Sequence, residues 1–447
     1  MTKKKFYIKT LGCKVNQYES QVIRENFLRD GYVEAESSDE ADICVVNTCT
    51  VTSASDSKSL KSIRSILGKK DKCVVATGCM IDDRELDLRK LKGVNFIIKN
   101  KDKYRIPEIA SSSAFGGLLA MTKGNTDSIT GFKGHARAFV KIQDGCDNRC
   151  SYCKVSIVRG RSRSRSFKEI INECAALIEN GYREIVLTGI CLGSYGRDIS
   201  KAISLSKLIM ELCKIKGDWR MRLSSIEPRD ITDDLIFQMK SEEKICKHLH
   251  IPFQSGDDEI LKRMNRPYTA RDYIGIVTRL RKVIPTIAIS TDMMVGFPGE
   301  KGPNFKNTMS FIKEIRPMRL HVFGFSKRTG TPAYNYKDGV STALKKQREH
   351  ALIDIVKGFT ADFEGMFIGK IARVLAEDKR DKQGFLQGYT DRYIKVLIDG
   401  PDSIKSSIIT CQLTHAPSLL PADNAYQKAG AGLTNQKVYG ILLSYSD

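Results

Sequence analysis

Short apolar runs alternate with amphipathic stretches through the first hundred residues of the chain. Strand-like runs lie at 6–10, 43–47 and 73–77, and helical patterns lie between them at 18–29 and 55–67. Strands that alternate with helices in this way are typical of a parallel sheet. The pattern therefore predicts a small parallel α/β domain over residues 1–110.

Residues 111–134 are rich in Ser, Gly, Thr and Lys without periodicity, which predicts a linker. From residue 135 onward, six strand-like runs recur with helical patterns between them. They lie at 138–142, 184–188, 220–224, 248–252, 288–293 and 320–323. Six successive βα units predict a partial (β/α)6 barrel over residues 135–366.

Beyond residue 366 the pattern changes to short strands separated by Asp, Gly and Lys turns. These strands are expected at 368–375, 384–390, 393–398 and 407–413. Such a series predicts a small OB-like β-barrel over residues 367–447. The stretch 417–432, rich in Ala, Pro and Gly, has no predicted element. The expected fold class is thus α/β, with the β-barrel as a third unit.

Net charge and cysteine content limit the classes of function that the protein can have. The 447 residues include 73 Lys and Arg against 52 Asp and Glu, a formal charge of +21, which favours a polyanionic partner such as nucleic acid over a merely soluble basic surface. No run approaches the roughly 20 apolar residues that span a bilayer, so we expect a cytoplasmic protein. Thiols stay reduced there, and some of the 13 cysteines are therefore better explained as metal or cluster ligands than as disulfides.

Three cysteines directly follow the first predicted barrel strand with the spacing C-x3-C-x2-C: Cys146, Cys150 and Cys153. Structural zinc needs four ligands, and no second cysteine pair or nearby His completes this set. Three thiolates suit a 4Fe-4S cluster with one iron left open. An open iron can chelate S-adenosylmethionine (SAM), whose reductive cleavage gives a carbon radical. We therefore favour radical chemistry over zinc or a simple electron-transfer cluster.

This motif, with Tyr152 before the last cysteine, resembles the radical SAM superfamily. Similar polar and Gly-containing segments follow later barrel strands at 187–189, 224–228, 250–256 and 291–300. Each alone is also typical of a helix cap or turn, but strand ends of one barrel share a mouth. The expected cofactor-binding residues are Thr188, Gly189, Ser225, Glu227, Gln254, Asp292 and Val295.

A second set of cysteines lies a few residues past the strands of the first domain: Cys13, Cys49 and Cys79. In a parallel sheet those ends meet at one edge, which is the usual place for a ligand site. Three converging thiolates would again hold a cluster. The alternative is three independent buried cysteines.

The segments LGCKVNQYES, NTCTVT and TGC around these cysteines resemble the N-terminal domain of the methylthiotransferases. In that family the three cysteines hold an auxiliary 4Fe-4S cluster, and the C-terminal barrel resembles its RNA-binding TRAM domain. GCKVNQYES and HVFGFSKRTGTPA resemble the branch that acts on N6-threonylcarbamoyladenosine in tRNA, next to the anticodon. The isopentenyladenosine branch usually reads GCQMN.

The resemblance implies a tRNA methylthiotransferase that uses SAM and two 4Fe-4S clusters, with a flavodoxin-like or ferredoxin-like electron donor. It does not identify the sulfur donor. Two alternatives stay open: methylthiolation of another target, namely isopentenyladenosine tRNA or a ribosomal protein, and a non-catalytic iron-sulfur RNA-binding protein.

Four arginines alternate with small residues just after the cluster motif: Arg159, Arg161, Arg163 and Arg165. In an extended segment all four guanidinium groups would point the same way, and we expect this row to bind RNA phosphates rather than form a solvated charge run. Aromatic residues of the C-terminal barrel, among them Tyr389 and Tyr393, offer stacking faces. Of the other cysteines, Cys191 stands where relatives generally carry His or Asn, and its role is left open.

Overall fold

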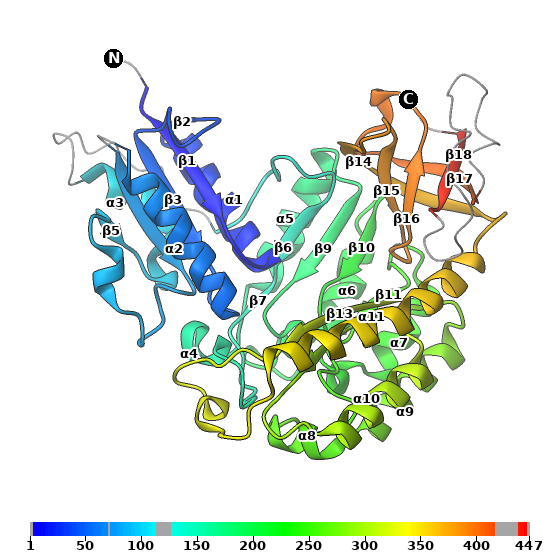
Figure 1. Ribbon diagram of the computed structural model, residues 1–447. Coiled ribbons are helices and arrows are strands. Elements are labelled where there is room, and N and C mark those ends of the chain that lie inside the picture. The colour runs from blue at the N-terminus through cyan, green and yellow to red at the C-terminus, as the bar shows by residue number, and fades with distance from the viewer. Residues whose placement is uncertain (1–2, 70–71, 113–126, 416–436, 445–447) are drawn as a thin grey trace.

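A computed structural model describes residues 3–69, 72–112, 127–415 and 437–444 (Figure 1). Most of the predicted linker, 113–126, and the stretch 417–432 lie outside the described residues. The proposed boundary at residue 110 falls inside a helix that ends at Ser112, so the first unit extends at least that far.

The N-terminal unit is a five-stranded parallel sheet in the order β2-β1-β3-β4-β5. Its strands are β1 Lys5–Thr10, β2 Val33–Glu34, β3 Ile43–Thr48, β4 Cys73–Gly78 and β5 Phe96–Ile97. Its helices are α1 Lys14–Arg29, α2 Ser53–Leu67 and α3 Ile106–Ser112, with 3-10 turns at Leu88–Leu91 and Asn100–Arg105. The parallel α/β prediction is confirmed.

The apolar run of β3 is continuous because both faces of this strand are covered. Ile43 and Val45 belong to a core on the side of α1, and Cys44 and Val46 belong to a core on the side of α2. Figure 1 shows α1 between this sheet and the next unit. The same helix therefore packs against both units, and Tyr18 enters the central core.

The central unit has six parallel strands in two sheets, β10-β9-β6 and β11-β12-β13. Isolated bridges Met221–Ile245 and Ser225–His250 join the sheets into one open barrel, as predicted. The strands are β6 Ala138–Lys141, β9 Glu184–Thr188, β10 Arg220–Leu223, β11 His248–His250, β12 Ala288–Val295 and β13 Arg319–Gly324.

Helices cover the outside of this barrel (Figure 1). They are α5 Phe167–Glu179, α6 Leu205–Cys213, α7 Asp233–Ser241, α9 Ala270–Val283, α10 Gly302–Ile315 and α11 Thr342–Gly365. The mouth adds β7 Gln143–Asp144, α4 Val155–Arg159, β8 Arg163–Ser164, α8 Asp258–Arg263 and 3-10 turns at Leu192–Ser194, Pro228–Asp230 and Pro332–Asn335. Ser or Thr side chains cap the amino ends of α5, α6, α7 and α9, so the sequence marks where these helices begin.

The C-terminal unit is a closed barrel in the order β14-β15-β16-β18-β17. Its strands are β14 Ile371–Arg380, β15 Leu386–Thr390, β16 Lys395–Ile398, β17 Ile408–Thr414 and β18 Tyr439–Ser444, with a 3-10 turn at Asp402–Ile404. The β18 strand was not predicted, yet it closes the barrel by pairing with both β16 and β17.

A buried carboxylate joins the two barrels. Glu184 is fully buried and contacts three guanidinium groups, those of Arg137 at 3.2 Å, Arg220 at 2.6 Å and Arg222 at 2.9 Å. Arg220 also donates to the carbonyl of Tyr389 at 2.7 Å, and Arg222 donates to backbone carbonyls of the same turn. Although burial acts to raise it, the arginine charges hold the pKa of Glu184 well below its usual range.

None of the helices in the described part of the chain is long and apolar enough to cross a membrane.

We expect Glu184→Gln to lower the free energy of unfolding by about 3 to 5 kcal/mol, because it leaves buried guanidinium groups without their counter-charge. Chemical denaturation checks this value. Glu179, an exposed residue at the end of α5, supplies the matched control Glu179→Gln, which should change stability little. Equal effects of the two variants would show that Glu184 has no special role.

Candidate functional site

The sheet brings Cys13, Cys49 and Cys79 to one edge. Cys49 and Cys79 directly follow β3 and β4, and Cys13 lies three residues past the end of β1, as the N-cap residue of α1. These three strands are neighbours in the sheet. Electrostatic interactions link Cys79 with both Cys13 and Cys49, and burial raises the pKa of the Cys49 and Cys79 thiols. The three side chains therefore share one site, open to solvent at Cys13.

Two glycines allow this convergence. Gly12 and Gly78 precede Cys13 and Cys79 with φ of +100° and +97°, a region that favours glycine. A Cβ on Gly12 would lie 2.8 Å from the Cβ of Cys49, and one on Gly78 would lie 2.4 Å from the carbonyl oxygen of Thr48. The strand ends can approach this closely only without those side chains.

Polar side chains that the sequence prediction missed fix the backbone of the site. The Asn16 amide donates to the carbonyls of Leu11 at 2.7 Å and Thr48 at 2.9 Å. The Ser59 hydroxyl accepts from the amide of Cys49 at 3.1 Å and donates to its carbonyl at 3.0 Å. Asn16 lies on the buried side of α1. Polar residues that recur at helical spacing on that side could have indicated from the sequence that this helix face lines a polar site.

The loop of Cys146, Cys150 and Cys153 lies past β6, at the mouth of the barrel (Figure 1). It docks on the end of α8, where Ser151 donates through its amide to the Met264 carbonyl at 2.9 Å and through its hydroxyl to the Arg263 carbonyl at 2.8 Å. These bonds hold the backbone of the loop between Cys150 and Cys153 against α8.

Donors point at the sulfur atoms of this loop. The Val155 amide donates to Cys153 Sγ at 3.5 Å, and Arg266 Nη1 donates to Cys150 Sγ at 3.6 Å. A hydrogen bond with Cys191 lowers the pKa of Cys146, so Cys191 adjoins the site. Burial raises the pKa of Cys153 to about 11, and binding a metal there requires the loss of its proton.

A second buried carboxylate lies between the two cysteine sites. Glu19 of α1 is 1% exposed and contacts Lys103 at 2.5 Å, Lys141 at 3.0 Å and Arg159 at 2.8 Å. Burial acts to raise the pKa of Glu19, but the charges of Arg159, Lys103 and Lys141 hold it well below its usual range. Glu19 therefore stays ionised and ties the N-terminal unit to the barrel.

Arg159 connects the two sites directly. Its Nε donates to Cys79 Sγ at 3.1 Å, and its Nη1 donates to Asp144 Oδ1 at 3.1 Å, two residues before Cys146. Three cations meet the two carboxylates of Glu19 and Asp144 in this network, which leaves one positive charge beside Cys79. That excess charge suits a thiolate ligand of an anionic cluster.

Both sets fit iron-sulfur clusters by the chemistry of their donors. Each offers three free cysteines, and N–H groups donate to one or more sulfurs of each set. Hydrogen bonds to sulfur are among the features that tune such clusters. The residues present thus match three-cysteine ligation in both places.

The expected SAM-binding residues lie at or just past the ends of β9, β10 and β11, or within β12. Glu227 accepts hydrogen bonds from Arg266 at 2.9 Å and from Tyr268. Gln254 has φ of 71°, and its buried Oε1 has no hydrogen-bond partner among the described residues. Thr188 and Val295 are buried, Gly189 adjoins Gln143, and Ser225 bridges His250. Their contact with SAM stays a prediction.

Asp292, another of these residues, lies between two imidazoles. It is 3.1 Å from Nε2 of His250 and 3.2 Å from Nδ1 of His321, on three adjacent strands. Hydrogen bonds with His250 and His321 hold the pKa of Asp292 low despite its burial. These three side chains could also hold a metal ion.

The structure corrects the predicted row of four arginines. Arg159 ends the helix α4 and is buried against Glu19, and Arg165 is ion-paired with buried Glu173 at 2.6 Å. The segment is not uniformly extended, so its guanidinium groups do not share a direction. Arg161 and Arg163 are exposed, and phosphate binding by these two stays a prediction.

The aromatic residues of the C-terminal barrel also differ from expectation. Tyr389 and Tyr393 stack on each other with centroids 4.9 Å apart, and Tyr393 stacks on His248 of the central barrel. The guanidinium groups of Arg137 and Arg222 lie over the Tyr393 ring. These rings therefore serve the junction of the two barrels, because charge and stacking partners already cover them.

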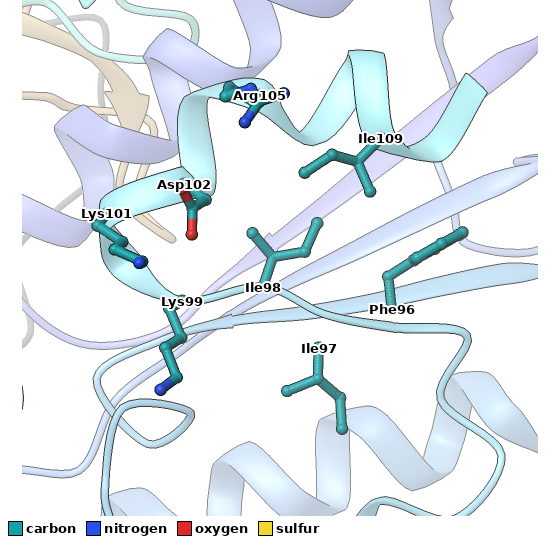
Figure 2. Close-up of a pocket in the computed structure, with 8 residues that line it drawn as sticks. All are labelled: Phe96, Ile97, Ile98, Lys99, Lys101, Asp102, Arg105 and Ile109. Atoms are coloured by element: carbon teal, nitrogen blue, oxygen red, sulfur yellow. The ribbon is translucent and has the colours of Figure 1, made fainter. Parts of the chain in front are cut away.

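A separate pocket lies beside the edge strand β5 (Figure 2). Its apolar lining includes Phe96 and Ile98, and Lys99, Lys101 and Arg105 surround it. It contains none of the candidate cysteines, so it is not part of the site.

Comparisons with known proteins agree with this geometry. Residues 140–312 match the Radical SAM superfamily, and residues 5–99 match the Uncharacterized protein family UPF0004. The radical S-adenosylmethionine methyltransferase TsrM of Kitasatospora setae, solved with cobalamin and a 4Fe-4S cluster, shares the fold with a TM-score of 0.55, at 15% identity over 74% of this chain and 77% of that chain. The fold and the cysteine loop define a radical SAM iron-sulfur enzyme.

Relatives of higher identity specify the family. The Threonylcarbamoyladenosine tRNA methylthiotransferase MtaB of Bacillus subtilis (strain 168) is 35% identical over 91% of this chain and 93% of its own length. The Thermotoga maritima protein of that name is 36% identical, over 87% and 90%. A tRNA-2-methylthio-N(6)-dimethylallyladenosine synthase of Acetivibrio thermocellus is also 36% identical, over 84% and 81%. The chain belongs to the methylthiotransferase family, and its cofactors are SAM and 4Fe-4S clusters.

Anaerobic reconstitution tests the two ligand sets. We expect about eight irons in the intact protein and about four after replacement of Cys146, Cys150 and Cys153 by Ala, because the sets bind independently. Replacing Cys13, Cys49 and Cys79 should also leave about four irons, and replacing buried Cys174 should remove none. An intact protein with only four irons, all lost in the first variant, would exclude the second set.

Proposed function

We propose that the enzyme inserts a methylthio group at C2 of the adenine in N6-threonylcarbamoyladenosine of tRNA, next to the anticodon. The observation that carries the proposal is the relative from Bacillus subtilis, named for this nucleoside, which aligns over 91% of the chain. Dimethylallyladenosine synthases align over 84% of the chain at 36% identity in one case and over 93% at 32% identity in another. They make isopentenyladenosine tRNA the second candidate substrate.

We assign the auxiliary cluster to Cys13, Cys49 and Cys79 and the SAM-binding cluster to Cys146, Cys150 and Cys153. When bound, the SAM-binding cluster would supply a radical that can remove hydrogen from C2, and the auxiliary cluster would hold the sulfur that replaces it. This chemistry needs electrons from a reducing donor of the flavodoxin or ferredoxin class. Hydrogen at C2 of a purine is not acidic, which is why acid-base catalysis alone would not suffice.

The side chains around the clusters have separate tasks in this proposal. Arg266 donates to Cys150 and holds the Glu227 carboxylate, so it fixes that carboxylate relative to the SAM site. Arg159 holds Cys79 and Asp144, so it fixes the distance between the two clusters. Fixed distances matter because transfer between two bound groups requires near-contact geometry.

The substrate test uses reconstituted enzyme, SAM, a strong reductant and anticodon stem-loop RNAs that carry threonylcarbamoyladenosine, isopentenyladenosine or adenosine. We expect mass spectrometry to detect the methylthio nucleoside only from the threonylcarbamoyladenosine RNA. The variant without Cys146, Cys150 and Cys153 should also release no 5'-deoxyadenosine. The variant without Cys13, Cys49 and Cys79 should release 5'-deoxyadenosine yet transfer no sulfur. Product from the isopentenyladenosine RNA alone would overturn the proposed substrate.

The RNA-binding role of the exposed arginines is tested by salt dependence. Replacing Arg161 and Arg163 with Gln should weaken binding of all RNAs alike and reduce the slope of log Kd against log salt by about 1 to 2, because phosphate contacts release counterions. The control replaces Arg271 and Lys282, exposed on the outer helix α9, and should leave the slope unchanged. An unchanged slope in the first variant would remove both arginines from the RNA interface.

A further inference from the structure

Residues 326–333, which follow β13, contact the loops of both cysteine sites, and we call this segment the brace. It is the end of the sequence HVFGFSKRTGTPA. Thr331 closes a tight turn within it, donating to the Arg328 carbonyl through its amide at 3.2 Å and through its hydroxyl at 2.7 Å. Arg328, Thr331 and Ala333 are buried. The brace therefore has one defined shape.

On the side of the N-terminal unit, the brace holds the loop of Cys49. Thr50 directly follows Cys49, and Arg328 Nη2 donates to its hydroxyl oxygen at 2.7 Å and to its carbonyl at 2.9 Å. The same nitrogen lies 2.6 Å from Asp56 Oδ2. The Thr50 hydroxyl in turn donates to Asp56 Oδ1 at 2.7 Å. Because the Arg328 side chain is only 5% exposed, these charge-assisted bonds are shielded from water.

On the side of the barrel, the brace holds the loop that ends at Cys153. The Ala333 amide donates to the carbonyl of Ser151, two residues before Cys153, at 2.8 Å. Lys154, the residue after Cys153, is buried and donates to Thr329 Oγ1 at 3.0 Å. The eight residues of the brace thus span the space between the two cysteine sites.

The brace and Arg159 connect the two sites at different points. Arg159 joins Cys79 to Asp144, just before the first barrel cysteine. The brace instead joins the Cys49 loop to the Cys153 end of the barrel loop. A single connection would let one site pivot about it, whereas two separate connections also fix the relative orientation of the sites.

We propose that the brace positions the auxiliary cluster relative to the SAM-binding cluster, with Arg328 as the positioning residue that couples radical formation to sulfur transfer. The inference rests on the proposed function. Cleavage of SAM needs only the barrel cluster, whereas sulfur transfer needs both clusters and the substrate carbon in near-contact geometry. Displacing one unit relative to the other would therefore leave radical formation intact while most radicals yield no product.

The experiment uses anaerobically reconstituted holoenzyme, SAM, reductant and the stem-loop RNA that carries threonylcarbamoyladenosine. It measures the 5'-deoxyadenosine released per methylthio nucleoside formed. Arg328→Gln should raise this ratio by about tenfold or more, because a misplacement of about 1 Å is enough to slow a reaction between bound groups to that extent. Its iron content should stay at about eight. Partial unfolding cannot mimic this result, since it lowers both products in proportion.

Two further variants make the test specific. The control Lys327→Gln removes a charge from an exposed position of the brace and should leave the ratio at the wild-type value. Asp56→Asn breaks the ion pair from the other unit and should also raise the ratio. The double variant with Arg328→Gln should be no worse than Arg328→Gln alone, because both changes remove one shared interaction. Effects that multiply would overturn the assignment of this pair.

Two results with Arg328→Gln would overturn the inference. An unchanged ratio at full iron content would show that the brace does not position the clusters. Loss of iron would show that it retains a cluster rather than orienting it. Failure of the proposed function is visible separately, because the wild-type enzyme would then release 5'-deoxyadenosine but form no methylthio product from this RNA.

Discussion

The ionised carboxylate of Glu19 is the interaction on which the arrangement of both cysteine sites depends. It is buried, and it can stay charged there only because Lys103, Lys141 and Arg159 surround it. These cations come from the N-terminal unit, from β6 and from α4, so satisfying one carboxylate fixes three segments at once. Ionic hydrogen bonds are directional, whereas apolar contacts permit sliding. The relative position of the two cysteine sites is therefore set by the geometry of these ion pairs.

The same solution recurs at the other end of the central barrel, where Glu184 contacts three arginines. Arg220 and Arg222 also donate to carbonyls of the C-terminal barrel, and Arg137 contacts the carboxylate of Glu377 there. Each unit keeps its own apolar core, and Tyr18 and Val22 of α1 extend the central one. Apolar packing thus stabilises the units, while two buried ionic nodes orient them. Loss of either node would cost more than a surface ion pair, since it leaves unpaired charge in a dry environment.

The sequence predicted the main strands and helices, although not β18. It also placed Cys13, Cys49 and Cys79 after strands whose ends lie at one edge of a parallel sheet, because strand ends of such a sheet converge. It could not predict the directions of Arg159 and Arg165, since one turn of helix at α4 breaks the extended geometry that the alternation suggested. Nor did it show that Tyr393 packs against His248, because both are ordinary surface candidates until two distant segments meet. The ion pairs of Glu19 could not be predicted for the same reason, because its partners lie 84, 122 and 140 residues away in the sequence.

The buried cysteine framework and the exposed basic residues differ in how freely they can change in evolution. Backbone turns, buried amide groups and buried ion pairs hold the cysteines in place. Most substitutions among these residues should therefore abolish activity. Arg161 and Arg163 are exposed, so their exchange should change stability little. Relatives named for two different modified nucleosides share 34 to 36% identity with this chain. A lineage could thus alter its RNA contacts by changing exposed side chains while it keeps the residues that hold its cofactors.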